Sequence, residues 1–568
     1  MARTDRRIGW VDLLLMLGLL GLFVGLFDFG RGWTGAHRAT VEIDLSPAAL
    51  PRYTFYSLSR GLIAYAFSLL FTLLYGYWAA KDKIAERVLV PLLDILQSIP
   101  VLGFMPGLVL ALVTLFPHSN IGLELACILM IFTGQVWNMT FSFFHSLRSV
   151  PADMREVDTV YRFNWWQRFK WVELPFATMG LVWNSMMSMA GGWFFLATIE
   201  SFQLGDADFR LPGIGAYMSV AVDKGDVPAM IYGIIAMTVM IVVVDQLLWR
   251  PIVVWAQKFR VEEGGSQEAM SSWFLDWLVR SKLLRSIRET IRKRRRAAMA
   301  SSSPPKPKDL TAPTTDPVHS AVWLARVLLG LLVVGLAYGG WRLFLLLVEV
   351  NPNEWGQLIG AAFVTLGRVL VSTLLGTLWA LPAGLAIGLS PRLSRILQPV
   401  VQVAASFPAP MLFPIVIGVL QLLGVSLDWG SILLMLLGTQ WYILFNVVAG
   451  TMAIPADLKE ATRSYRFGTW QRFWILYLPA VFPYLVTGWV TAAGGAWNAS
   501  IVAEIVTFKG ETLRAVGLGA EISLAAKDKN LPVLTASILV MSALVVIFNR
   551  VVWRRMYDLA ERRYSLNK

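Results

Sequence analysis

Two copies of one polar and aromatic segment stand out in this sequence of 568 residues. Residues 151–175 align without gaps to residues 455–479, and 13 of the 25 positions are identical. Both copies share a Pro-Ala-Asp start, Tyr-Arg-Phe and Gln-Arg-Phe elements and a Leu-Pro end. Loops ordinarily diverge, so this likeness indicates that an external partner constrains both copies. The residues expected to take part are Pro151, Asp153, Glu156, Tyr161, Arg162, Trp166 and Arg168, and then Pro455, Asp457, Glu460, Tyr465, Arg466, Gly468, Trp470 and Arg472.

The local pattern predicts a short helix–turn–helix in each copy. A proline suits the first helical turn, and the acids that follow it complement the positive end of a helix. Asn164 in the first copy and Gly468 in the second are expected to permit the turn into the second helix. The alternative is a loop that packs only against its own domain.

The sequence offers little for catalysis or metal binding. Its one cysteine, Cys127, lies in an apolar run, and its four histidines are scattered. No Gly-x-x-x-x-Gly-Lys-Ser/Thr loop or Gly-Lys dipeptide is present, so the chain lacks the usual means of holding nucleotide phosphates. We therefore expect no metal, no cofactor and no enzymatic activity in this chain.

The elements that must position the repeated segments are membrane spans. The composition is 56% apolar and only 15% charged, with a mean hydropathy of +0.59, which excludes an ordinary soluble protein. Runs of about 20 apolar residues predict about twelve transmembrane helices. The expected spans are 8–28, 57–80, 92–116, 121–143, 175–200, 228–249, 321–349, 359–389, 397–425, 430–452, 479–502 and 533–553.

The basic residues predict the orientation. Lys and Arg precede the first span and follow the second, fourth and last spans, whereas residues 117–120 and 350–354 contain neither. Basic loops stay in the cytoplasm, so both termini and both repeated segments are expected there. The first apolar segment is expected to be a retained span, because no small-residue cleavage site follows a short apolar core.

A basic linker separates two membrane domains. Residues 258–308 hold 13 Lys and Arg against 5 Asp and Glu, which accounts for +8 of the net charge of +13. Trp273, Phe274 and Trp277 recur at helix-like spacing, and the segment predicts an amphipathic helix on the inner membrane surface and a flexible tether. A regulatory or nucleic-acid-binding patch is the alternative, but we expect no nucleic-acid partner. The expected domains are 1–257, 258–320 and 321–568.

The duplication extends well beyond the loops. Trp193, Glu200 and Gly213 each have a counterpart 304 residues later, and upstream the offset grows to 308. Each half therefore has six spans, and an even number means that the two repeats run in the same direction. The predicted fold is an all-α polytopic membrane protein of two parallel six-helix repeats.

The loop resembles the signature of ABC importer permeases, in which a Glu-Ala-Ala start leads to Leu-Pro nineteen residues after the Glu. Glu156 leads to Pro175 and Glu460 to Pro479 at this spacing, but the glycine of the signature is replaced by Arg162 and Arg466. The Trp-Gln-Arg-Phe element is similar to the nitrate, sulfonate and taurine branch. The resemblance implies a type I importer fold and two permeases fused in one chain. It also implies loops that act as coupling helices on two cytoplasmic ATP-binding subunits, where ATP and magnesium would bind.

Several paired residues are candidates for the translocation path or its gate. Prolines break the third and ninth spans, and freed backbone carbonyls are tolerated at membrane depth where a cavity or protein receives them. A simple structural kink is the alternative for the prolines, helix–helix hydrogen bonds for the glutamines, and salt bridges for the glutamates. Arg60 and Arg368 could attract an anion or extend to the lipid headgroups. The candidates are Ser98, Pro100, Pro106, Gln135, Glu200, Ser406, Pro408, Pro414, Gln440 and Glu504.

The sequence thus predicts an importer permease in a bacterial inner membrane that passes a small solute, by family analogy an anion such as nitrate, sulfonate, taurine or bicarbonate. A solute-binding protein would deliver the solute, docking on the segments 201–227 and 503–532. The alternative is an ion-coupled secondary transporter with two six-helix halves. That class predicts its paired motif between spans two and three, whereas here the motif lies between spans four and five.

Overall fold

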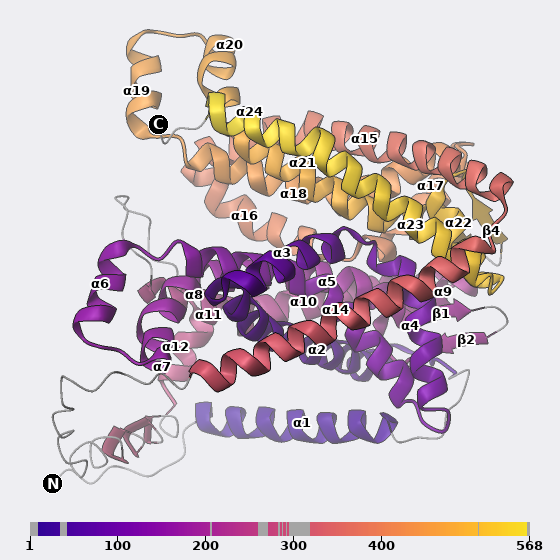
Figure 1. The fold of residues 1–568 in the computed structure, drawn as a ribbon, viewed down its shortest axis with the longest axis horizontal. Helices are drawn as coiled ribbons and strands as arrows, with labels where there is room; N and C mark the ends of the chain where they lie inside the picture. Colours follow the sequence, from indigo (N-terminus) through magenta and orange to yellow (C-terminus); the bar gives the residue numbers. More distant parts are fainter. Residues whose placement is uncertain are drawn as a thin grey trace. The chain divides into compact units, whose positions relative to one another are not determined.

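The computed structural model describes residues 10–33, 42–204, 207–259, 271–281, 285–294 apart from 287 and 291, 318–508 and 511–564. These residues are almost entirely helical (Figure 1). Nine of the helices in this part of the chain are long and apolar enough to cross a membrane, and eleven spans result if each of two bent pairs counts as one. The expected span at 175–200 is present as α8, Leu174–Ile199, which is not among these nine helices and carries Asn184 and two serines, Ser185 and Ser188.

The described chain divides into two compact units. One unit comprises Met1–Gly32 with Val243–Leu345, and the other comprises Trp33–Val242 with Leu346–Lys568. The second unit therefore contains most of both repeats. The domain limits predicted at 257 and 320 stay predictions. Within the first unit, α1 (Trp10–Trp33) and α14 (Val318–Val348) are the long apolar helices.

The basic linker is described only in part. Helix α12, Trp273–Val279, begins with Ser272 as its N-cap, and Trp273 donates a hydrogen bond to Gln246. Arg250, at the start of α11 (Arg250–Ala256), donates to the backbone oxygen of Ser271. The aromatic start of the linker is thus held to the end of the sixth predicted span. Residues 260–270, 282–284, 287, 291 and 295–317, including most of the predicted tether, lie outside the described part.

Each repeat has the same order of elements. In the first, three long helices, α2 (Leu50–Lys81), α5 (Ile121–Arg148) and α8, pack side by side, with α5 in contact with both others. In the second, α15 (Pro352–Leu389), α18 (Leu427–Met452) and α21 (Leu478–Ala503) pack in the same way. Helices α10 (Val227–Val244) and α23 (Leu531–Phe548) follow, and α24 (Arg554–Tyr564) closes the described chain.

The contact between the first two long helices depends on a glycine in both repeats. Gly76 of α2 lies against Phe143 of α5, and a Cβ at Gly76 would come within 2.9 Å of that ring. Gly384 of α15 lies against Val447 of α18, where a Cβ would come within 2.6 Å. Close approach of helices at small residues is the usual basis of packing in membranes, and here it supports the core of each bundle.

The third and ninth predicted spans are bent helix pairs. Helices α3 (Lys83–Ser98) and α4 (Val101–Leu115) meet at 97°, and α16 (Pro391–Ser406) meets the η5–α17 segment (Ala409–Leu412 and Phe413–Leu422) at 84°. Helix α4 packs against α21 and α23 of the other repeat, whereas α16 and η5 pack against α8 of the first. The bent pairs therefore supply contacts between the two repeats, and further contacts join α22 to β1 and α9 to β3.

The loop and a β-hairpin lie at opposite ends of α8, and likewise of α21 (Figure 1). Strands β1 (Ser201–Leu204) and β2 (Ala207–Arg210) pair antiparallel with Ser201 opposite Arg210. Strands β3 (Ile505–Phe508) and β4 (Glu511–Arg514) pair with Ile505 opposite Arg514. A short helix follows each hairpin, α9 (Ile214–Asp223) and α22 (Leu518–Lys527).

Candidate functional site

Both repeated segments form the predicted helix–turn–helix. The first consists of α6 (Ala152–Val160) and α7 (Trp165–Arg168), and the second of α19 (Ala456–Ser464) and α20 (Thr469–Arg472). Each proline directly precedes its first helix, and an acid, Asp153 or Asp457, lies in the first turn. One π-helical turn, Phe169–Glu173 or Phe473–Tyr477, then leads into the following long helix.

The turn itself corrects the sequence prediction. Arg162 and Arg466 take left-handed backbone angles, with φ of 51° and 54°. The amide groups of Phe163 and Phe467 bond back to the carbonyl oxygens of Asp158 and Thr462, which is the Schellman arrangement of a helix C-terminus. The arginines therefore adopt the conformation that a glycine would favour, at a cost of about 1 kcal/mol each.

Asn164 and Gly468 do not make the turn, contrary to the prediction. Both have extended backbone angles and cap the second helix instead. The side-chain oxygen of Asn164 accepts from the backbone amide of Gln167 at 2.8 Å, and the backbone amide of Asn164 donates to Gln167 Oε1 at 2.9 Å. Gly468 has no side chain to offer, but its amide donates to Gln471 at 2.9 Å. Two such contacts fix the second helix in the first copy, and one of them is kept in the second.

The loops project an exposed aromatic and charged surface. Tyr161 and Tyr465 are 70% and 77% exposed, and Trp166 and Trp470 are 52% and 71% exposed. Exposed aromatic side chains that gather at one place are typical of a protein-binding surface. Trp166 stacks on Phe169 at 5.8 Å between ring centroids, and Trp470 stacks on Phe473 at 5.7 Å.

The loops differ in what lies beneath them. In the first, Arg168 pairs with Asp158, and Lys81 at the end of α2 pairs with Glu173. Asp158 Oδ1 and Glu173 Oε2 are buried without a hydrogen-bond partner. Both acids line a cavity of about 610 Å³ whose other charged walls are Lys81, Arg148, Arg155 and Arg168.

The second loop has an uncharged support. Thr462 and Tyr477 occupy the positions of Asp158 and Glu173, and the buried Nε of Arg472 has no hydrogen-bond partner. Partial burial, with a smaller effect of neighbouring Arg463, lowers the pKa of Lys459 on α19. The two loops thus share a surface and differ in their attachment to the helices below.

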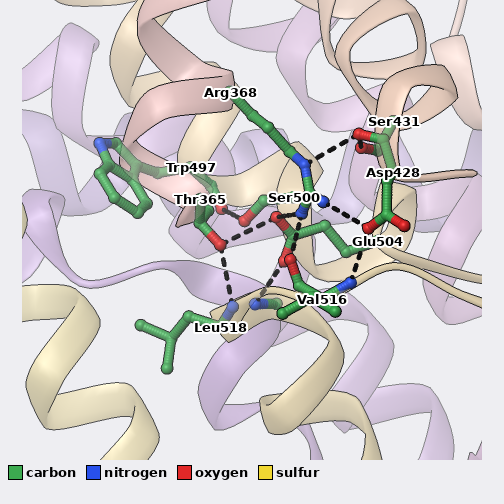
Figure 2. Close-up of polar contacts among 10 residues, drawn as sticks. Thr365, Arg368, Asp428, Ser431, Trp497, Ser500, Glu504, Val516 and Leu518 are labelled. Carbon is green, nitrogen blue, oxygen red and sulfur yellow. Dashed lines mark hydrogen bonds and ion pairs between the residues drawn. The ribbon is translucent and has the colours of Figure 1, made fainter. Parts of the chain in front are cut away.

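A buried network of charged residues lies in each bundle at the end that carries the β-hairpin, which we call the hairpin end. Arg60 of α2 donates to both oxygens of Glu124 and to Glu200 Oε1, each at 2.7 Å. Glu200 also accepts from Ser57 and from the backbone amide of Gly215. In the second repeat, Arg368 pairs with Asp428 and Glu504 (Figure 2).

The second network is built from matching parts. Glu504 accepts from Thr365 Oγ1 and from the amide of Gly519, both at 2.8 Å, and Thr365 in turn accepts from the amide of Leu518 (Figure 2). Val516 supplies a carbonyl to Arg368 and an amide to Asp428. Each network thereby holds the start of the helix that follows the hairpin, α9 or α22.

These contacts correct one sequence prediction. Arg60 and Arg368 neither extend to headgroups nor offer a free positive charge, because both are buried and ion-paired. Glu200 and Glu504 are fully buried members of the networks, in agreement with their salt-bridge alternative. Glu124 and Asp428 were missed, although their spacing of 304 residues in the repeat could have paired them.

The proline and serine candidates for the gate lie at the bends of the two helix pairs or in the helices on either side. Pro100 and Pro408 lie at the bends, whereas Pro106 and Pro414 lie inside α4 and α17. Ser406 is buried and donates to the Gln402 carbonyl, and the side chain of Ser98 lies outside the described part. An unpredicted contact joins the repeats here, because Asn498 of α21 accepts from the amide of Val101 at 2.7 Å.

The two glutamines have different surroundings. Gln135 is buried between helices, where it lies 3.4 Å from Ser68 Oγ and 3.4 Å from the sulfur of Met189. It also covers Gly192, at which a Cβ would come within 2.5 Å of the amide nitrogen. Gln440 is only partly buried. Among the described residues, no group of three or more His, Cys, Asp or Glu side chains could hold a metal ion.

The fold and these loops define a polytopic helical transport protein of two like halves. The chain belongs to the family of binding-protein-dependent transport system inner membrane components, which it matches twice, over residues 72–248 and 372–566. It is therefore a multi-pass inner-membrane permease of a transport family, and the two matches correspond to its two repeats.

Several characterised permeases are similar to parts of the chain. It is 27% identical over 157 residues to the nitrate import permease protein NrtB of Synechocystis sp., covering 28% of this chain and 54% of the relative. It is 30% identical over 142 residues to the bicarbonate transport system permease protein CmpB of the same organism, covering 25% and 49%. The taurine transport system permease protein TauC of Escherichia coli is 25% identical over 142 residues, covering 25% and 50%. The chain spans about half the length of these relatives.

Proposed function

We propose that this chain forms the membrane part of an ATP-driven importer for a small anion, with its translocation path between the two repeats. The observation that carries the proposal is the repeated helix–turn–helix, whose exposed aromatic and charged residues suit two protein-binding sites. The loops would face the cytoplasm with both termini and receive two ATP-binding subunits that hold ATP and magnesium. The hairpin end would receive the solute-binding protein.

The bent helix pairs support the position of the gate. They contact the opposite repeat, so a movement of one repeat against the other must change these contacts. Nucleotide-driven closure of the partner subunits would move the loops, and the π-helical turns join each loop directly to α8 or α21. Such motion between two states is the general form of alternating access. The relatives named for nitrate, bicarbonate and taurine support a small anionic or zwitterionic solute.

The test is co-purification of an ATPase with the full chain. We expect a P-loop ATPase to accompany the wild-type protein, and the pair Glu156→Gln and Glu460→Gln to abolish its binding. Glu511→Gln is the matched control, because Glu511 is an exposed carboxylate on the hairpin at the other end of α21. An ATPase that stays bound to the double variant, or no ATPase with the wild type, would refute the proposal.

Transport by the reconstituted complex tests the solute and the gate. With a binding protein present, the transported anion is expected to stimulate ATP hydrolysis, and nitrate, bicarbonate and taurine are the first solutes to compare. Replacing Pro408 should uncouple ATP hydrolysis from transport if the bend is a gate. Unaltered transport with unaltered coupling would leave Pro408 as a structural kink only.

A further inference from the structure

The identical positions of the two loops lie on the outside. Of the 13 identical positions, none is buried in either copy, and eight are exposed in both. Folded proteins usually keep buried positions and vary exposed ones, so this distribution is the reverse of what packing alone would maintain. The eight positions are Pro151/Pro455, Ala152/Ala456, Asp153/Asp457, Glu156/Glu460, Tyr161/Tyr465, Arg162/Arg466, Trp166/Trp470 and Gln167/Gln471.

The two surfaces also share one shape. The left-handed turn has φ of 51° and 54° in the two copies, and the Schellman bonds of Phe163 and Phe467 measure 3.1 and 3.0 Å. Tyr161 lies 6.0 Å from Phe163 between ring centroids, and Tyr465 lies 6.1 Å from Phe467. The chain keeps arginine at a turn position that disfavours it, in both copies, which indicates that the guanidinium group itself is needed there.

The support beneath the loops does not explain this likeness. The residues buried beneath the first loop, Asp158 and Glu173, are replaced by Thr462 and Tyr477. Lys81, which pairs with Glu173, has Leu389 at the corresponding position of the second repeat. The buried attachments differ, whereas eight of the fourteen positions exposed in both copies are identical, so the shared exposed residues are the part of the two loops that can bind the same partner.

The shared chemistry defines the partner's binding surface. Two acids lie on the first helix and one guanidinium on the turn, with a tyrosine and a tryptophan beside them. A complementary site needs basic groups for the acids, an acceptor for the arginine and an apolar pocket for the rings. A site that fits one loop therefore fits the other.

We propose that the two loops bind two copies of the same ATPase subunit, not two different subunits. This inference rests on the proposed function and adds the composition of the motor to it. The two binding sites are equivalent, whereas the residues that attach the two loops to the long helices differ. One ATPase protein can therefore drive two halves that respond to it differently.

The composition of the complex tests this inference directly. Native mass spectrometry of the chain purified with its ATPase is expected to show one ATPase mass, present twice per chain. Two different ATPase masses on one chain would overturn the inference while leaving the proposed function intact, and a single copy would contradict both. If no ATPase accompanies the chain, the proposed function fails instead.

Matched single variants give a second, independent measurement. Glu156→Gln and Glu460→Gln alter the same position of the two surfaces, so each is expected to weaken the binding of one ATPase copy by a similar factor, within about threefold. Asp158→Thr gives the first loop the buried residue of the second and is expected to leave two copies bound. A difference of more than about tenfold between the two glutamine variants would contradict equivalent sites.

Discussion

Removing Arg60 tests whether the buried networks hold the hairpin ends of the bundles. Arg60→Met deletes four hydrogen bonds of 2.7–2.8 Å and leaves Glu124 and Glu200 buried with side-chain exposures of 5% and 0%. Breaking a buried ion pair by removing one partner costs about 3–5 kcal/mol. We expect Arg60→Met to destabilise the hairpin end of the first bundle by an amount in this range.

Arg368→Met is the matched comparison. It also leaves Glu504 buried, but the Asp428 side chain is 48% exposed and can be hydrated. One buried acceptor fewer is left unsatisfied, a difference of roughly 1–3 kcal/mol. The loss should therefore be smaller in the second repeat than in the first.

Trypsin offers a local assay of this difference. The bonds after Arg210 and Arg514 are each followed by a buried residue, Leu211 or Ala515, whose amide donates to the carbonyl of Glu200 or Glu504. Cleavage there requires local opening, and a cost of about 3–5 kcal/mol corresponds to a rise of roughly a hundredfold to a few thousandfold in the open population. We expect faster cleavage after Arg210 in Arg60→Met, measured by mass spectrometry in lipid nanodiscs.

A triple variant separates charge from shape. Arg60→Met with Glu124→Gln and Glu200→Gln removes all three charges, and neutral replacements of buried ion clusters are often tolerated. Most of the resistance to trypsin should return. Wild-type cleavage in Arg60→Met, or a larger effect of Arg368→Met, would refute the reasoning.

Three further predictions concern single contacts. In Arg466→Gly, the Phe467 amide should be protected from hydrogen exchange by about 1 kcal/mol more than in Arg466→Ala, because only glycine adopts the left-handed turn freely. Equal protection in the two variants would contradict a strained turn. Thr462→Asp should supply the missing acceptor to Arg472 and stabilise the second loop against hydrogen exchange by about 1 kcal/mol. Asp158→Thr should speed hydrogen exchange in the first loop. Faster exchange in Thr462→Asp would contradict the assignment of Arg472 Nε as unpaired. Asn498→Ala should expose the Val101 amide at a cost of about 1 kcal/mol, and Asn498→Asp should retain the bond; identical exchange in both variants would show that the contact between repeats is dispensable.

The sequence alone determined the architecture and the position of the loops. Apolar length sets the spans because a helix must satisfy its backbone within the bilayer, and the duplication pairs the halves directly. The loops were found because their copies had stayed alike in types and spacing. The turn was predicted at Asn164 and Gly468, two residues too late, because asparagine and glycine favour left-handed turns. An arginine that binds a partner can be kept at such a position despite a backbone cost of about 1 kcal/mol.

Only the tertiary structure decided which charges meet. Arg60, Glu124 and Glu200 lie 64 and 76 residues apart along the chain, and nothing local shows that three helices bring them together in a buried network. The same holds for Asn498, which reaches the bend of the opposite repeat. Long-range pairing depends on how helices cross, and a residue's type and neighbours along the chain do not contain that information. The exposed likeness and buried divergence of the two loops likewise became visible only once burial was known.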